Sequence, residues 1–307
     1  MNDAPGGPSP VAPGLPASLM IGGRSFVWGE RTYLVGVLNA TPDSFSGDGE
    51  LDPQAAADHA RRLVDEGADL LDIGAESTRP GAAGIDAEEE WRRLGPVLRA
   101  LRAVVDAPIS VDTSKAAVAA RAFEAGADAL NDVLGLRSDP ALAPLLGRSG
   151  LPALLMHNQR GRERSGDAIV DVRAGLVESL RIAEAAGVPP ERIVLDPGFG
   201  FGWEPAENLE LLRRLGELRA LGRPLLLGTS RKSTVGLLLD EPDAERRLWG
   251  TAATVALAVA SGVDLVRVHD VAEMAQVVRV ADAVVRGWAP AAPDAGPPAS
   301  ITPAHAR

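Results

Sequence analysis

The chain contains no cysteine, so it cannot form a disulfide, use a thiolate nucleophile or bind a metal through sulfur. Histidine is also scarce, with four residues in a chain of 307. These are His59, His157, His269 and His305, and no two of them have the sequence spacing of zinc ligands. The composition therefore argues against a zinc enzyme.

Positive charge is in deficit as well. The chain has 31 Lys and Arg against 42 Asp and Glu, for a net charge of -11. A nucleic-acid-binding protein is normally basic, so we expect no nucleic-acid partner. An anionic small-molecule substrate is still compatible with this charge, because a local cleft can be positive on an acidic protein.

Long apolar runs are absent, and none approaches the ~18 residues that a membrane-spanning helix needs. No basic residue precedes Arg24, so the start of the chain lacks the charged region of a signal peptide. We therefore expect a cytoplasmic protein. Residues 1–19 and 289–307 are rich in proline, glycine and alanine, which predicts two disordered tails around one folded domain at residues 20–288.

Between the tails, short apolar runs alternate with helical patterns. The predicted strands are residues 33–38, 70–73, 109–111, 129–130, 153–156, 193–195, 225–227 and 265–268. The predicted helices are residues 59–66, 89–105, 115–125, 172–186, 207–221, 245–260 and 271–285. This βα alternation predicts an α/β fold, a (β/α)8 TIM barrel. An open doubly wound sheet is the alternative, although it normally has a glycine-rich turn where this chain has Asn39-Ala40-Thr41-Pro42.

The active site of a barrel lies at the carboxyl ends of its strands, and all eight predicted strands here end in polar residues. Taken singly, such residues have simpler explanations. Asp132 and Asp270 could be helix caps, and His157 could be a packed wall residue. Eight polar strand ends together indicate a functional site.

Several of these strand ends resemble the motifs of the dihydropteroate synthase family. The matching segments run in the family's order over about residues 25–288, and they are 38–46 (Leu-Asn-Ala-Thr-Pro-Asp-Ser-Phe-Ser), 76–81 (Glu-Ser-Thr-Arg-Pro-Gly), 112–115 (Asp-Thr-Ser-Lys), 196–202 (Asp-Pro-Gly-Phe-Gly-Phe-Gly), 230–233 (Ser-Arg-Lys-Ser) and 267–270 (Arg-Val-His-Asp). The resemblance implies condensation of 6-hydroxymethyl-7,8-dihydropterin diphosphate with 4-aminobenzoate. The products would be 7,8-dihydropteroate and diphosphate.

The resemblance also assigns roles to individual residues. Asp112, Asn131, Asp196 and Lys232 would bind the pterin, and Asp112, Lys232 and Arg79 would be the catalytic residues. A carboxylate can accept from the 2-amino group and the adjacent ring N–H of a pterin at once, which suits Asp196. Asp112 would stabilise positive charge on the pterin as diphosphate leaves. The amine of 4-aminobenzoate is already a neutral nucleophile, so a strong general base is unnecessary.

The remaining roles concern the leaving group and the second substrate. Asn39, Arg79, Arg267 and His269 would bind diphosphate, and Asn39 would also be the protein's ligand for the expected cofactor, Mg²⁺. The implied 4-aminobenzoate slot consists of Phe45, Thr78, Pro80, Phe201 and Ser233.

The chain departs from the family pattern at two places. Trp203 stands where a lysine is usual, for which we expect altered packing rather than lost activity. The first loop reads Ser46-Gly47-Asp48-Gly49 in place of Ser-Asp-Gly-Gly.

Two other functions are kept open, a folate-dependent methyltransferase barrel and a non-catalytic pterin-binding homologue. The 76–80 and 230–233 segments favour the synthase over the first, because they would serve diphosphate and 4-aminobenzoate. Retention of Arg79, Lys232 and the Asn39 loop favours it over the second. The resemblance further suggests a homodimer formed through late helices such as residues 245–260, whose small side chains permit close packing.

Overall fold

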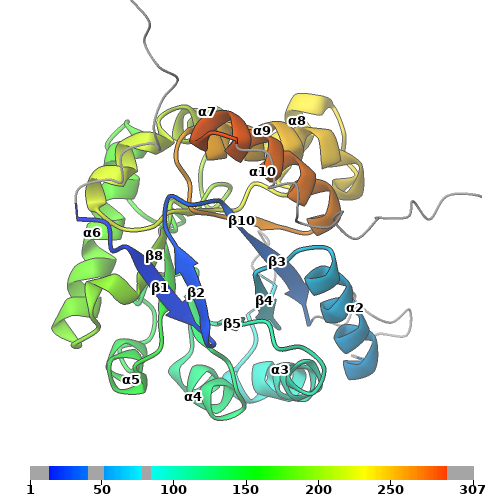
Figure 1. Cartoon of the computed structure of the whole chain (residues 1–307). Helices are drawn as coiled ribbons and strands as arrows, with labels where there is room; N and C mark the ends of the chain where they lie inside the picture. Colours follow the sequence, from blue (N-terminus) through cyan, green and yellow to red (C-terminus); the bar gives the residue numbers. More distant parts are fainter. Residues whose placement is uncertain (1–13, 41–51, 78–83, 289–307) are drawn as a thin grey trace, which may run out of the picture.

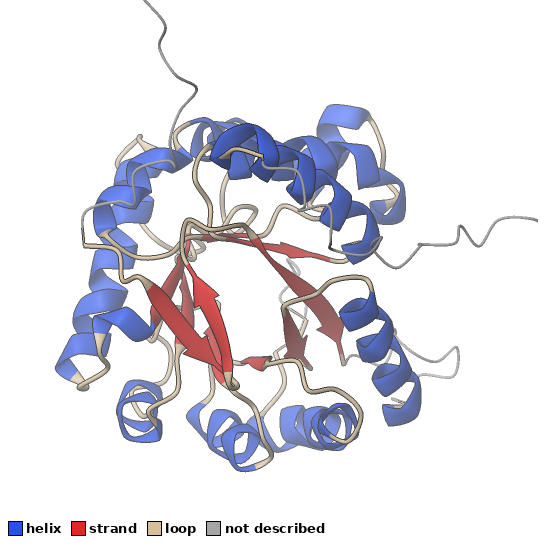
Figure 2. Cartoon of the chain, viewed as in Figure 1, coloured by secondary structure: helices blue, strands red, loops and turns tan. Residues whose placement is uncertain are grey.

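The computed structural model describes residues 14–40, 52–77 and 84–288. In this part of the chain, eight parallel strands form one sheet in the order β8-β7-β6-β5-β4-β3-β10-β9, and a parallel bridge between Leu195 and Leu225 joins its two edges (Figure 2). The strands are β3 (Tyr33–Asn39), β4 (Leu70–Gly74), β5 (Ile109–Asp112), β6 (Ala129–Asp132), β7 (Ala153–Met156), β8 (Ile193–Asp196), β9 (Leu226–Leu227) and β10 (Leu265–Val268). The predicted TIM barrel is confirmed, and the open doubly wound alternative is wrong.

Helices surround the barrel and bury one face each against it (Figure 1). They are α2 (Pro53–Asp65), α3 (Ala87–Arg102), α4 (Ala116–Glu124), α5 (Leu142–Ser149), α6 (Ala168–Ala185), α7 (Pro205–Arg213), α8 (Ser233–Leu239), α9 (Leu248–Ala260) and α10 (Val271–Arg286), with 3-10 turns η1 (Pro190–Arg192), η2 (Leu215–Leu221) and η3 (Ala244–Arg247). The helix predicted for residues 207–221 is wrong as one element, since it divides into α7 and η2 at Arg214. No helix in the described segments has the length and apolar character to cross a membrane.

A β-hairpin that the sequence pattern did not predict closes the amino-terminal end of the barrel. Its strands are β1 (Ser18–Ile21) and β2 (Arg24–Val27), which lie across the near end of the barrel in Figure 1. The rings of Phe26 and Tyr33 are 4.7 Å apart at their centroids, within a buried cluster that includes residues of the barrel strands. The hairpin therefore leaves only the carboxyl end of the barrel for a site.

The hairpin also corrects the predicted domain boundary. Residues 1–19 were expected to be a disordered tail, but Ser18 and Leu19 belong to β1 and Leu19 is buried. The alternation of buried and exposed residues in β1 covers only four positions, so composition alone did not indicate it. Of the two predicted tails, residues 1–13 and 289–307 lie outside the described residues.

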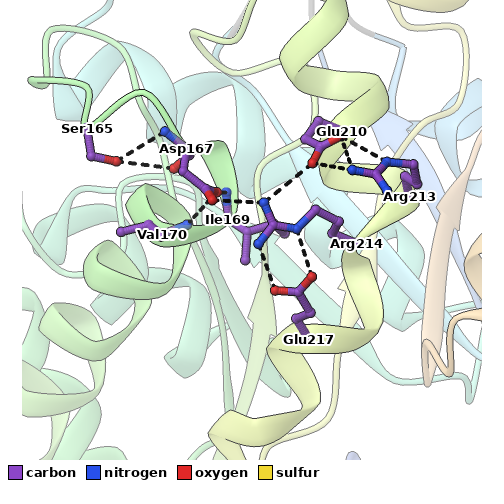
Figure 3. A network of polar contacts seen from close by, with 8 residues as sticks. All are labelled: Ser165, Asp167, Ile169, Val170, Glu210, Arg213, Arg214 and Glu217. Carbon is purple, nitrogen blue, oxygen red and sulfur yellow. Dashed lines mark hydrogen bonds and ion pairs between the residues drawn. The ribbon is translucent and has the colours of Figure 1, made fainter.

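Surface ion pairs connect α6 with α7 (Figure 3). The Asp167 carboxylate caps α6 by accepting from the Ile169 N–H at 2.9 Å, and it also accepts from Arg214 Nη1 at 2.9 Å. Arg214 in turn pairs with Glu217 and with Glu210 of α7. Exposed pairs of this kind each contribute little to stability, so the network is a surface link between the two helices and not a main source of stability.

Candidate active site

The strands of the barrel and the loops after them bring four charged side chains around one guanidinium group. Arg267 of β10 lies with Nη1 3.5 Å from Asp72 Oδ2 and Nη2 3.5 Å from Asp196 Oδ2. Its side chain is only 10% exposed, and the surrounding carboxylates raise its pKa against the effect of burial. Asp112 and Lys232 interact electrostatically with the same group. Four predicted site residues therefore meet here, joined by Asp72.

Asp72 was not predicted as a site residue. It is buried within β4, and its carboxylate accepts from Ser110 Oγ at 2.7 Å and from Asn131 Nδ2 at 2.7 Å. The available signal was a carboxylate inside an otherwise apolar strand, Leu-Leu-Asp-Ile, where a charge is costly unless it is paired. Asp72 thus holds both Asn131 and Arg267 in place.

Two buried acceptors in this cluster have no hydrogen-bond donor. They are Oδ1 of Asn131 and Oδ2 of Asp196, of which the second has only the ion pair with Arg267. Asp72 fixes the orientation of the Asn131 amide, because Nδ2 must face the carboxylate, and this leaves Oδ1 as an acceptor. Buried acceptors are normally paired, so this pair indicates a ligand that supplies N–H donors.

The loop after β8 holds Asp196 through its glycines. The Gly198 N–H donates to Asp196 Oδ1 at 2.8 Å. Gly198 has φ +75°, and a Cβ atom there would lie 1.8 Å from the carbonyl oxygen of His157. Only glycine fits this position. The backbone of the loop therefore holds one carboxylate oxygen of Asp196, and the other oxygen faces the site.

Lys232 connects the Asp196 side of the site to an aromatic ring. Its ammonium nitrogen lies 4.0 Å from the centroid of Phe201, which is buried, within cation–π distance. Burial and the positive charge of Arg267 lower the pKa of Lys232 to about 7, while Asp196 opposes that shift. That Lys232 lies between the pterin and 4-aminobenzoate stays a prediction.

Asp112 stands at the end of β5 with a perturbed acidity. Burial and the nearby charge of Asp72 raise its pKa well above the ordinary value, and Arg267 offsets part of the shift. A carboxylate whose ionisation depends on neighbouring charges in this way is common at catalytic sites.

His269 is held by a serine of the preceding strand-end loop. Ser230 Oγ accepts from the His269 backbone N–H at 3.2 Å and lies 3.0 Å from His269 Nδ1. A hydroxyl oxygen can accept a second N–H or donate its own proton, so this contact is compatible with either tautomer of the neutral ring. Burial and Arg231 lower the pKa of His269 to about 4, so near pH 7 the ring is a neutral donor.

The other predicted residues lie near this cluster or outside the described segments. Asn39 is the exposed last residue of β3, and Ser233 is the exposed first residue of α8. Four predicted residues lie outside the described part of the chain, namely Phe45, Thr78, Arg79 and Pro80. The roles of all these residues stay predictions.

Comparison with known proteins identifies the family. The family model described as pterin binding enzyme matches residues 35–269, which is more than half of the chain. The chain belongs to the pterin-binding enzyme family. The family resemblance seen in the sequence motifs is thereby confirmed, together with the class of enzyme, a transferase.

Relatives and solved structures within the family are similar over most of the chain. A dihydropteroate synthase of Synechocystis is 46% identical over 279 residues, covering 88% of this chain and 96% of its own. A structure of Xanthomonas albilineans dihydropteroate synthase with 4-aminobenzoic acid has a TM-score of 0.83 and 42% identity, covering 87% of this chain and 98% of its own. Another from the same organism, in complex with 7,8-dihydropteroate, has a TM-score of 0.80 and 40% identity, with the same coverage. These similarities favour the synthase over both alternative functions.

The first departure from the family pattern, Trp203, has a packing role. Its side chain is buried in the main core, and its ring centroid lies 5.7 Å from that of His157. The expected effect of Trp203 on packing, with activity retained, stays a prediction. The second departure, residues 46–49, lies outside the described segments.

Proposed function

We propose that the strand-end cluster condenses 6-hydroxymethyl-7,8-dihydropterin diphosphate with 4-aminobenzoate, giving 7,8-dihydropteroate and diphosphate. The observation that carries this proposal is the pair of buried acceptors without donors, Asp196 Oδ2 and Asn131 Oδ1. A pterin presents a 2-amino group beside a ring N–H, and both are donors. Asp196 accepts from that donor pair, and Asn131 accepts at the neighbouring ring edge.

Burial of these acceptors makes the site selective for the ring. Asp196 and Asn131 are each at most 2% exposed, so a ring without matching donors would leave their oxygens unpaired. An unsatisfied buried acceptor costs roughly 1–3 kcal/mol. Lys232 donates to the pterin oxygen and ring nitrogen, which excludes rings that present a donor on that side.

The chemical step separates charge, and three groups respond to it. Positive charge develops on the pterin methylene as the bond to diphosphate breaks, and the Asp112 carboxylate stabilises it. Arg267 and the neutral His269 ring contact the departing anion. The 4-aminobenzoate amine then bonds to the methylene and loses one proton to solvent. The described part of the site needs no dedicated general base for this step.

A magnesium ion fits this site as a companion of diphosphate. No three His, Cys, Asp or Glu side chains in the described segments are grouped to hold a metal. Mg²⁺ often keeps several waters and binds through one or two protein oxygens plus phosphates, so the Asn39 amide oxygen suits it. When bound, the ion would neutralise charge on the leaving diphosphate.

The second substrate would lie on the far side of Lys232. Phe201 offers a ring for the aromatic face of 4-aminobenzoate, and the exposed hydroxyl of Ser233 is available to its carboxylate. Lys232, in contact with Phe201 and attracted to Asp196, then separates the two substrates. This order places the amine near the pterin methylene.

The proposal is tested with purified protein, both substrates and magnesium. We expect 7,8-dihydropteroate to form, activity to be lost with a chelator and restored by Mg²⁺. Asp196→Asn should abolish pterin binding in calorimetry, because an acceptor pair becomes one donor and one acceptor. Asp171→Asn, on the outer helix α6, is the matched control and should bind normally. Tight pterin binding by the Asp196 variant would contradict the assignment.

We also propose that two copies of the chain associate through α8, α9 and α10, which lie side by side (Figure 1). These helices expose large apolar side chains, among them Leu237, Trp249, Leu257, Val280 and Val284. Trp249 is 79% exposed, and monomeric proteins rarely expose contiguous apolar patches of this kind. A self-complementary twofold contact would cover the patch on both copies.

Light scattering after gel filtration tests this association. The wild-type chain should have the mass of a dimer, and Trp249→Glu should give a monomer. Val170→Glu is the control, since Val170 is exposed on α6 far from the three helices in sequence and on a different part of the helix ring. A monomeric wild type at micromolar concentration would reject the homodimer.

A further inference from the structure

Asn208 of α7 connects two segments that each carry a residue of the site. Its amide is buried, with the side chain only 1% exposed. Oδ1 accepts from the Gly200 N–H at 2.7 Å, while Nδ2 donates to Thr234 Oγ1 at 3.0 Å and to the Trp203 carbonyl at 3.4 Å. Because Gly200 N is an obligate donor, the amide has only one orientation.

The first segment is the loop after β8. Gly200 directly precedes Phe201, has φ +82°, and would place a Cβ atom 3.0 Å from Lys232 Cδ. The backbone at Gly200 therefore packs against the Lys232 side chain. A shift of this backbone would change that packing and move the Phe201 ring at the same time.

The second segment is the start of α8. Thr234 is the second residue of the helix, after Ser233, and Lys232 is the N-cap residue with an extended backbone. The capping carboxylate or hydroxyl common at helix starts is absent here, since Lys232 makes no side-chain cap. The link from Thr234 to Asn208 is thus one of the side-chain contacts that hold this turn.

We propose that Asn208, acting through Thr234 and Gly200, is a positioning residue that sets the separation between Lys232 and Phe201. The inference rests on the proposed function, in which the Lys232 ammonium contacts the pterin and the Phe201 ring contacts 4-aminobenzoate. The Asn208 amide is hydrogen-bonded both to the loop that carries Phe201 and to the start of the helix that follows Lys232. Its loss would loosen the second-substrate slot while leaving the acceptors at Asp196 and Asn131 unchanged.

The test compares two substitutions at Thr234. Thr234→Val keeps the shape but removes Oγ1, so Asn208 Nδ2 retains only the long contact to Trp203. Thr234→Ser retains the hydroxyl and is the matched control. Misplacement of reacting groups by about 1 Å can cost roughly 10²-fold in rate. We therefore expect Thr234→Val to raise KM for 4-aminobenzoate and lower kcat by about tenfold each, and to raise KM for the pterin less, because Asp196 and Asn131 still bind the ring.

Two further variants keep the test decisive. Thr234→Ala removes the hydroxyl without demanding space, and should reproduce the kinetic effect if the valine variant does not fold. Glu210→Gln changes the outer face of α7 and should leave both KM values unchanged.

The possible outcomes separate this inference from the proposed function. If the wild type is active and the kinetic constants of Thr234→Val are unchanged, the positioning role alone is overturned. The same holds if this variant differs from the wild type only in Tm. A wild type that forms no dihydropteroate would overturn the proposed function and this inference with it. Selective loss of 4-aminobenzoate affinity, rescued by serine, would support the role of Asn208.

Discussion

The ammonium nitrogen of Lys232 lies 4.0 Å from the centroid of the Phe201 ring, at the boundary between the two proposed substrate sites. Burial and Arg267 lower the pKa of this lysine to about 7. Lys232 therefore changes its charge within the physiological range, although most lysines remain protonated there. Its proposed contacts with the pterin require the protonated, donating form.

The first prediction follows from that pKa. In the free enzyme, Lys232 is protonated below pH 7 and loses its proton above it, so kcat/KM for the pterin substrate should fall about tenfold per pH unit above ~7. Lys232→Arg should abolish this alkaline limb, since an arginine stays charged. Steady-state kinetics from pH 6 to 9 provides the measurement. A flat wild-type profile over this range would show that Lys232 stays protonated there and that its pKa is not lowered to about 7.

The second prediction concerns Asp112. Asp112→Asn keeps the shape of the side chain but removes the charge opposite the developing cation, so turnover should fall roughly 10²–10³-fold. Pterin affinity should change far less, because the proposed acceptors at Asp196 and Asn131 remain. Single-turnover kinetics and pterin titration separate the two effects. Unchanged turnover would exclude Asp112 from the mechanism.

Much of the barrel could be predicted from the sequence because its strands are short apolar runs that end in polar residues. All eight predicted strands correspond to strands of the structure, although 225–227 shortens to Leu226–Leu227. The prediction missed α5 and α8, which have eight and seven residues and too few turns for a clear helical period. The hairpin that closes the barrel was missed for a similar reason.

The site was harder to predict wherever a side chain's partner is distant in sequence. Asp270 was kept open as a helix cap, and it occupies the N-cap position of α10 without a capping hydrogen bond. Its carboxylate instead pairs with Arg231, at 2.5 Å and 3.2 Å. In the sequence, Asp72 is only a polar residue within a predicted buried strand. Its contacts with Asn131 and Arg267 are found in the structure alone. Sequence spacing cannot indicate such tertiary pairs.

The third prediction concerns the closed end of the barrel. Phe26 is fully buried against Tyr33, and Phe26→Ala should lower the free energy of unfolding by about 3–5 kcal/mol. The substitution lies at the end opposite the site, so turnover per folded molecule should not change. Urea denaturation with activity measured at low temperature tests both parts. Val27→Ala, at an exposed position of the same strand, is the control.

The fourth prediction uses Asp72 to test the electrostatics of the whole cluster. The Asp72 charge is the second-largest cause, after burial, of the raised pKa of Asp112. Asp112 must be ionised to stabilise the developing cation, so turnover should fall as the pH decreases through that raised pKa. Removing the Asp72 charge should lower the Asp112 pKa and move this acid limb to lower pH.

Asp72→Asn isolates the charge because it can preserve the hydrogen bonds. Its amide oxygen can accept from Asn131 Nδ2, and its amide nitrogen can donate to Ser110 Oγ, the two partners that Asp72 now has at 2.7 Å. We expect the acid limb of kcat to shift down by about one pH unit, the usual scale of neighbour effects in folded proteins. Asp72→Ala removes the charge and also the hydrogen bond that holds Asn131, so this variant should also lose pterin affinity. If Asp72→Asn leaves the acid limb where it is, the Asp72 charge does not act on the group that controls this limb.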